Sequence, residues 1–215
     1  QQAWAALFEQ FLDDHAGPDH GPYTEADYLA HIDGRPRFDG VRTFLASRGF
    51  VLPDGTPDDP PGDTTVGALG NRKNELFQTL LREQGMTPYA GSSQLLDHLA
   101  SIGMATAIVS SSRNAREVLA AARLADRFPV VVDGVVAAER HIAGKPAPDM
   151  FLAAAGDLGV APSAAVVVED AVSGVAAGAA GGFAHVIGVD RGAGHDALRA
   201  HGADVVVDDL AELLP

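Results

Sequence analysis

The chain has 215 residues, 47% of them hydrophobic and 20% charged, so it is long enough to bury a sizeable core and has ordinary globular composition. Its 29 acidic and 15 basic residues give a net charge of -14, which argues against binding to nucleic acid or to an anionic membrane surface. The absence of cysteine excludes disulfides, thiolate metal ligands and cysteine nucleophiles. Without a secretory signal or an apolar stretch approaching ~18 residues, we expect a cytoplasmic protein.

Residues 1–86 have the pattern of a small helical bundle, because apolar side chains recur at helical spacing in its first and last segments. Thr24 followed by Asp27 matches an acidic form of the capping box and predicts a helix start, and Gly49 is typical of a helix end. The segment 52–65 is rich in proline, glycine and aspartate, which predicts a surface loop. Four helices are predicted, at 1–15, from 24 onward, around 41–49 and at 66–83.

In residues 87–215, short apolar runs alternate with helical patterns. The runs are continuous in hydrophobicity, which predicts strands buried on both faces of a parallel sheet. Alternating strands and helices imply right-handed crossovers, so we predict an α/β fold with a doubly wound, Rossmann-like sheet. Strands are predicted at 105–109, 129–132, 164–168, 185–189 and 204–207, and helices from 92 or 93 to 102 and at 114–124, 149–158, 172–180 and 195–201.

Polar residues that follow the predicted strands are candidates for a ligand site, because ligands bind at the carboxyl ends of strands in such sheets. Ser110, Ser111, Ser112, Arg113 and Asn114 come directly after one strand and lead into a helix. Hydroxyls and free amides at a helix N-terminus suit phosphate oxygens. Taken alone, the cluster is more typical of a helix cap that holds no ligand.

Two further candidates are a lysine and a pair of carboxylates. Lys145, one of only two lysines, precedes a predicted helix in a proline-rich loop, where it can neutralise a phosphate or a developing charge. Glu169 and Asp170 directly follow another strand, and adjacent carboxylates suit Mg²⁺, which prefers oxygen ligands. The alternatives are a solvated loop lysine and helix capping by Asp170.

In their order and spacing, these segments resemble the motifs of the haloacid dehalogenase-like superfamily of phosphotransferases, and more narrowly its β-phosphoglucomutase branch. Ser110 matches the second motif of that family, Lys145 the third, and Glu169 with Asp170 the fourth. The helical half is similar to the cap domain of the branch. The resemblance implies a cap at 1–86, an α/β core at 87–215, and Mg²⁺ held by Glu169 and Asp170.

The first motif of the family, a strand that ends in two aspartates two positions apart, matches nothing in this chain. In the family, that segment precedes the cap and supplies both the nucleophile and the central strand of the sheet. A doubly wound sheet without its central strand would leave two rows of backbone groups unpaired. We therefore expect this strand and its nucleophilic aspartate upstream of Gln1.

The mechanism that the resemblance implies passes through an aspartyl phosphate, since a carboxylate can act as a covalent nucleophile. Attack of an anion on a phosphate dianion is repulsive, so Mg²⁺ and a lysine must offset the charge. Lys145 would hold the transferring phosphoryl group. Ser110 would donate a hydrogen bond to one of its oxygens, assisted by the backbone amide of Ser111.

A mutase also needs a second site, for the phosphate at the far end of the sugar. Arg37 and Lys73 lie in segments similar to those with which the family's cap grips its substrate, and the planar fork of an arginine suits bidentate phosphate contact. Ser112, Arg113 and Asn114 are expected to support the same phosphate or the sugar hydroxyls. The alternative for Arg37 and Lys73 is a solvated helix face.

Three functions are weighed on these observations. The leading hypothesis is a β-phosphoglucomutase-like enzyme that interconverts glucose 1-phosphate and glucose 6-phosphate by way of a bisphosphate. The second is a sugar-phosphate phosphatase of the same superfamily. The third is a noncatalytic binding or regulatory module of a larger polypeptide, which holds if the first motif is absent. For the enzyme we expect a monomer that acts on a small sugar phosphate.

Overall fold

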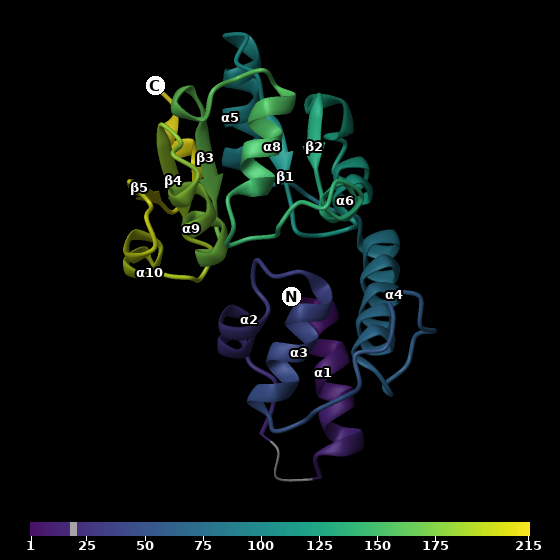
Figure 1. The fold of residues 1–215 in the computed structure, drawn as a ribbon. Helices are drawn as coiled ribbons and strands as arrows, with labels where there is room; N and C mark the ends of the chain where they lie inside the picture. Colours follow the sequence, from purple (N-terminus) through teal and green to yellow (C-terminus); the bar gives the residue numbers. More distant parts are fainter. Residues whose placement is uncertain (18–20) are drawn as a thin grey trace. The chain divides into compact units, whose positions relative to one another are not determined.

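The structure is a computed structural model that describes residues 1–17 and 21–215 (Figure 1). It divides into two compact units, Gln1–Gly85 and Met86–Pro215, which we call the helical unit and the α/β unit. Within the described ranges, no helix combines the length and the apolar character needed to span a membrane.

In the part of the helical unit that the structure describes there are four helices: α1 (Gln2–His15), α2 (Glu25–His31), α3 (Arg37–Ser47) and α4 (Val66–Gln84). The capping box predicted for α2 is confirmed, because the Thr24 hydroxyl accepts a hydrogen bond from the Asp27 amide while the Asp27 carboxylate accepts one from the Thr24 amide. Helix α4 is also capped by a threonine: the Thr65 hydroxyl accepts a hydrogen bond from the Ala68 amide at 2.9 Å.

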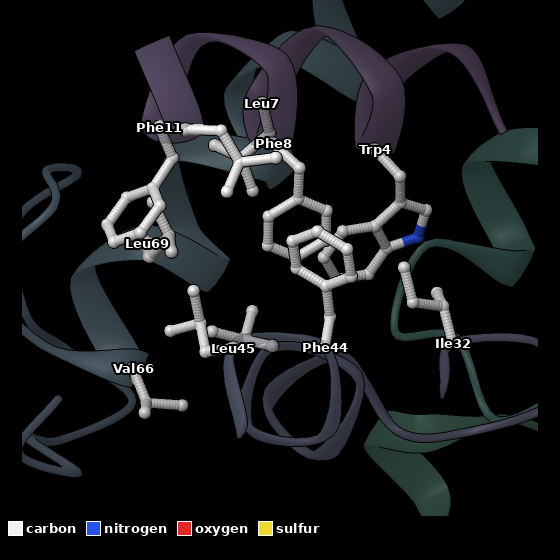
Figure 2. Close-up of a cluster of buried hydrophobic side chains, with 11 residues drawn as sticks. Trp4, Leu7, Phe8, Phe11, Ile32, Phe44, Leu45, Val66 and Leu69 are labelled. Atoms are coloured by element: carbon white, nitrogen blue, oxygen red, sulfur yellow. The ribbon is translucent and has the colours of Figure 1, made fainter. Parts of the chain in front are cut away.

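The core of the helical unit is built mainly from the apolar stripe of α1 packed on α3 and α4 (Figure 2). The rings of Phe8 and Phe44 have centroids 4.0 Å apart, and Trp4 stacks on Phe8 at 5.3 Å. Each large apolar side chain buried in this way contributes about 1.5–3 kcal/mol of transfer free energy. The unit thus has a hydrophobic core of its own.

The α/β unit alternates strands with helices and confirms the predicted fold class. Its elements are α5 (Ala90–Ser101), β1 (Ala107–Val109), α6 (Ala115–Ala121), β2 (Val130–Val132), α7 (Gly134–Glu139), α8 (Asp149–Asp157), β3 (Val166–Glu169), α9 (Val172–Ala180), β4 (His185–Val189), α10 (His195–Ala200) and β5 (Val205–Val207), with short 3-10 helices at Ala125–Arg127, Pro162–Ala164 and Leu210–Leu213. Helix α7 was not predicted.

All strand pairs are parallel, but they form two sheets. Strand β1 pairs with β2, with Ala107 opposite Val130, while β4 lies between β3 and β5, with Ile187 opposite both Val168 and Val205. Among the residues that the structure describes, no ladder joins β1 to β3. The inner edge of each of these two strands therefore makes no strand pair in the described chain.

The expectation that every strand is buried on both faces is wrong: β1 has no fully buried residue, Val205 of β5 is 48% exposed, and β3 departs from it most clearly. The residues of β3 alternate between exposed and buried, and Val166 and Val168 are 50% and 41% exposed. The reason is the placement of the helices: α9 packs on β3 and β4, whereas α8 packs on β1 and β2. The opposite face of β3 is left open, and Val167 on the covered face belongs to the buried cluster.

Candidate active site

The segment 110–114, here called the serine turn, connects the end of β1 to the start of α6. The Ser110 amide donates to the Val132 carbonyl of β2 at 3.0 Å, which continues the ladder one residue beyond β1. The Ser110 hydroxyl accepts a hydrogen bond from the Ser112 amide at 3.2 Å, and the Ser112 hydroxyl accepts one from the Asn114 amide at 3.1 Å. The hydroxyls thus fold the turn and retain their own protons to donate.

Lys145 and Glu169 form a buried ion pair. The Lys145 ammonium donates a hydrogen bond to Glu169 Oε1, and the two side chains are only 6% and 7% exposed. Glu169 Oε2 accepts hydrogen bonds from the backbone amides of Asp170 and Ala171, at 3.0 and 3.2 Å. An unpaired charge in such a site is strongly unfavourable, so loss of either partner would leave the other charge buried without compensation.

Helix α9 approaches this pair so closely that one position excludes a side chain. A Cβ on Gly174 would lie 2.2 Å from Cδ of Glu169 and 2.3 Å from its Oε1. Gly174 therefore makes room for the carboxylate. Its role was not predicted, because nothing in the small-residue run of α9 separates this glycine from Gly178 before the approach of Glu169 is known.

Asp170 and the serine turn occupy the same unit as the buried pair. Asp170 is exposed just after β3, Ser112 and Arg113 are exposed, and Asn114 is buried. In Figure 1 the chain leaves β1 and β3 at the same end of the unit, the end at which α8 begins. The structure brings Lys145 and Glu169 into contact and sets Asp170 and the serine turn at that end of the α/β unit.

The donor set at the end of β3 fits a hard cation. Both oxygens of Glu169 take part in hydrogen bonds, to Lys145 and to backbone amides, and the next residue, Asp170, is an exposed carboxylate. Proteins commonly hold Mg²⁺ through one or two carboxylates and leave the remaining positions to water and substrate phosphate. Asp170 thus fits a direct ligand, with Glu169 held beside it.

Arg37 and Lys73, the two cations predicted to grip a phosphate, both lie in the helical unit. The Lys73 ammonium is 4.9 Å from the ring centroid of Trp4 and 4.7 Å from that of Phe77. Burial, and then the positive charge of Arg37, lower the pKa of Lys73 to about 8. The alternative of a solvated helix face is therefore wrong for Lys73, which lies against two aromatic rings beside a second cation.

A histidine–aspartate cluster lies at the carboxyl ends of β4 and β5. His195 Nε2 is 2.7 Å from Asp208 Oδ1 and 3.9 Å from Asp190 Oδ2. Hydrogen bonds from the amides of Gly192 and Gly194 outweigh burial and lower the pKa of Asp190, which keeps this carboxylate ionised beside the imidazole. The cluster ties the start of α10 to the end of β5.

A family model described as a haloacid dehalogenase-like hydrolase matches residues 2–182. The chain therefore belongs to this family, and the family resemblance drawn from its motifs is confirmed.

Within the family, the chain is similar to β-phosphoglucomutases. It is 52% identical over 221 residues to the β-phosphoglucomutase of Mycobacterium bovis, across 99% of this chain and 84% of that protein. It is 33% identical over 198 residues to hexitol phosphatase A of Escherichia coli, across 90% of this chain and 80% of that protein. The crystal structure of a β-phosphoglucomutase from Clostridium difficile shares the fold, with a TM-score of 0.76 and 21% identity over 99% of this chain and 87% of that one.

Proposed function

We propose that the protein is a Mg²⁺-dependent phosphomutase that interconverts β-glucose 1-phosphate and glucose 6-phosphate by way of a glucose bisphosphate. The observation that carries this proposal is the buried Lys145–Glu169 pair beside Asp170, in a chain 52% identical to a β-phosphoglucomutase over nearly its whole length. Lysine side chains are rarely buried to this degree. Because the chain has only two lysines, the burial of Lys145 in an ion pair indicates that its charge is used.

Each candidate in the α/β unit has a part in phosphoryl transfer. The Lys145 ammonium has three donors, of which Glu169 takes one, so the same group can bind an oxygen of the transferring phosphoryl group. The Ser110 hydroxyl donates to another oxygen. Asp170, with Glu169 held beside it, would hold Mg²⁺, which when bound offsets the repulsion between the phosphate and a carboxylate nucleophile.

The cations of the helical unit favour a mutase. Lys73, which lies against two aromatic rings, and its neighbour Arg37 repel each other because both are positively charged. An anion bound between them would relieve this repulsion. A mutase requires such a second anion site because its intermediate carries two phosphates. Arg37 supplies a bidentate fork, and Lys73 a point charge.

The test offers β-glucose 1-phosphate and catalytic glucose 1,6-bisphosphate to the full-length protein with Mg²⁺. The proposal expects glucose 6-phosphate as the product. Release of inorganic phosphate without glucose 6-phosphate would instead establish a sugar-phosphate phosphatase, the candidate favoured by the similarity to hexitol phosphatase A. No turnover of either kind would leave the noncatalytic binding module.

The substitution Arg37→Ala tests the second phosphate site. We expect it to lower the mutase kcat/KM by roughly 10²-fold, about 3 kcal/mol, which is the scale of a charge-assisted contact to a phosphate. Hydrolysis of a simple aryl phosphate, which has no second phosphate, should change little. Equal losses in the two reactions would remove Arg37 from the substrate site.

A further inference from the structure

The serine turn is hydrogen-bonded at two points: its first residue, Ser110, to the last residue of β2, and its middle residue, Ser112, to the first residue of α7. The Ser110 amide donates to the Val132 carbonyl at 3.0 Å, and the Gly134 amide donates to the Ser112 carbonyl at 3.1 Å. The residue between these two anchors is Asp133. Any rotation of the backbone at Asp133 therefore moves both anchors, and with them the hydroxyl of Ser110.

The contact between the turn and Gly134, the first residue of α7, is too close for a side chain. A Cβ on Gly134 would lie 2.8 Å from the Ser111 carbonyl oxygen and 3.2 Å from the Arg113 amide nitrogen, both of which are backbone atoms of the turn. Two backbone segments in such contact cannot shift independently, because interiors are close-packed. The position of the turn is therefore set by the segment 132–134.

The Asp133 carboxylate fixes this segment. The residue is 0% exposed, and its Oδ1 accepts hydrogen bonds from the amides of Val135 and Val136, each at 3.0 Å, which caps α7. No described residue donates a hydrogen bond to Oδ2. This oxygen instead forms an ion pair with the Arg116 guanidinium, whose Nε lies 3.4 Å away. Arg116 belongs to α6, which directly follows the serine turn.

One buried carboxylate thus joins the helix that begins after the turn to the helix that begins after β2. Capping α7 would need only a neutral acceptor such as serine or asparagine. A fully buried carboxylate is unfavourable unless it is paired, and the ion pair with Arg116 links this one to α6. The negative charge of Asp133 has no part in the phosphoryl-transfer step proposed above.

We propose that Asp133 is a positioning residue for phosphoryl transfer: it sets the serine turn so that the Ser110 hydroxyl donates to the phosphate. This inference rests on the proposed function, in which Ser110 binds the phosphoryl group. Asp133 itself does not touch the substrate, because its side chain is fully buried.

The substitution Asp133→Asn, made in the full-length protein, tests the inference. It keeps the size of the side chain and an acceptor for α7 but removes the charge that holds Arg116. We expect kcat/KM for the sugar phosphate to fall roughly ten- to a hundred-fold, the scale of a misplaced catalytic contact. The matched control is Asp157→Asn, which removes the carboxylate paired with Arg140 at 2.7 Å, away from the turn, and should leave kcat/KM unchanged.

The Ser110→Ala background separates positioning from general damage. If Asp133 acts through Ser110, adding Asp133→Asn to Ser110→Ala lowers kcat/KM no further, although it still lowers the melting temperature. A full additional loss, or wild-type kcat/KM in the single Asp133→Asn variant, overturns the inference. If Ser110→Ala alone keeps wild-type kcat/KM, the part of Ser110 in the proposed function fails instead.

One further measurement and one further variant keep the test decisive. If turnover of Ser110→Ala is too slow to follow, the same four proteins are compared by their affinity for inorganic phosphate in calorimetric titration, with the same expectations. If Asp133→Asn does not fold, Arg116→Gln removes the same ion pair from its exposed partner. We expect Arg116→Gln to lower kcat/KM in the same direction by a smaller factor, and an unchanged value would overturn the inference.

Discussion

At the scale of single residues, the buried pair of Lys145 and Glu169 leaves no room for a side chain at position 174, where the chain has a glycine. We expect Gly174→Ala to displace the Glu169 carboxylate, because the new methyl group would lie 2.2 Å from its Cδ. The expected result is a fall in the free energy of unfolding of about 3 kcal/mol, the scale of a broken buried ion pair, together with a large loss of kcat. Denaturant unfolding and the mutase assay measure the two effects.

The matched control is Gly156→Ala, in helix α8 of the same unit. No heavy atom lies within 4 Å of a Cβ built on Gly156, and the backbone there is helical. Alanine should therefore leave activity unchanged and raise the free energy of unfolding by up to about 1 kcal/mol. A comparable loss of activity in both variants would show that the effect at Gly174 is unrelated to Glu169.

The pKa of Lys73 gives a second residue-scale prediction, on stability against pH. Burial and the Arg37 charge lower this pKa from 10.5 to about 8. Between these values the unfolded chain holds a proton that the folded chain has released, so stability rises with pH across the window. The wild-type protein should gain up to about 3 kcal/mol relative to Lys73→Met from pH 7 to pH 10.5, at about 1.4 kcal/mol per pKa unit.

Urea unfolding of both proteins at several pH values measures this difference. The comparison with Lys73→Met removes the titration of all other groups and keeps an apolar stem against Trp4 and Phe77. A difference that stays flat from pH 7 to pH 10.5 would mean that Lys73 titrates as a solvated lysine.

The candidate site shows which residues a sequence can reveal. Ser110, Lys145 and Glu169 were predicted because each is a polar group at a fixed place relative to a strand or a helix, and the sequence pattern locates strands. Gly174 and Asp133 were not, because each is defined by how closely two elements approach. That distance depends on tertiary packing and leaves no local pattern.

At the scale of elements, helix α2 is short and has no fully buried residue, so its ends matter more than its packing. The carboxylate of Asp27 completes the capping box and also binds Arg48 at 2.8 Å. Burial acts to raise the pKa of Asp27, but hydrogen bonds from Thr24 and Arg48 outweigh it, and the net pKa is lowered. The stability that this carboxylate contributes is therefore present above its unfolded pKa and is lost as the pH falls through the folded pKa.

Thr24→Ala removes one half of this capping box. We expect the free energy of unfolding of the helical unit to fall by about 1 kcal/mol, the usual value for a lost N-cap. Thr79→Ala, in the interior of α4, provides the control, since alanine is the better helix former there and should be neutral or slightly stabilising. Equal losses of stability in the two variants would show that the Thr24 hydroxyl contributes no more than the hydroxyl of a threonine inside a helix, and that the cap itself contributes nothing.

Elements also differ in how well the sequence predicted them. The capping box of α2 was recognised because it is a local pattern of two residues. Helix α7 was missed because its valines continue the β-branched run of β2, and only Asp133, which accepts hydrogen bonds from the next two free amides, turns the chain into a helix. The exposed face of β3 was missed because it depends on which strands α8 covers.

At the scale of the whole molecule, the two units have separate hydrophobic cores, and one spectroscopic probe distinguishes them. Trp4 is the only tryptophan of the chain and lies in the core of the helical unit. Its fluorescence should follow the unfolding of that unit, whereas circular dichroism follows both. Two fully or almost fully buried leucines allow a matched comparison: Leu45 in the helical unit and Leu198 in the α/β unit.

Leu45→Ala and Leu198→Ala should each cost about 2–5 kcal/mol in the unit that carries the substitution. If the two units unfold independently, Leu45→Ala shifts the urea midpoint of Trp4 fluorescence. Leu198→Ala then leaves that midpoint unchanged and shifts only the part of the circular dichroism transition that comes from the α/β unit. A fluorescence midpoint that moves equally in both variants would show one cooperative transition, in which the α/β core also stabilises the unit that holds Arg37 and Lys73.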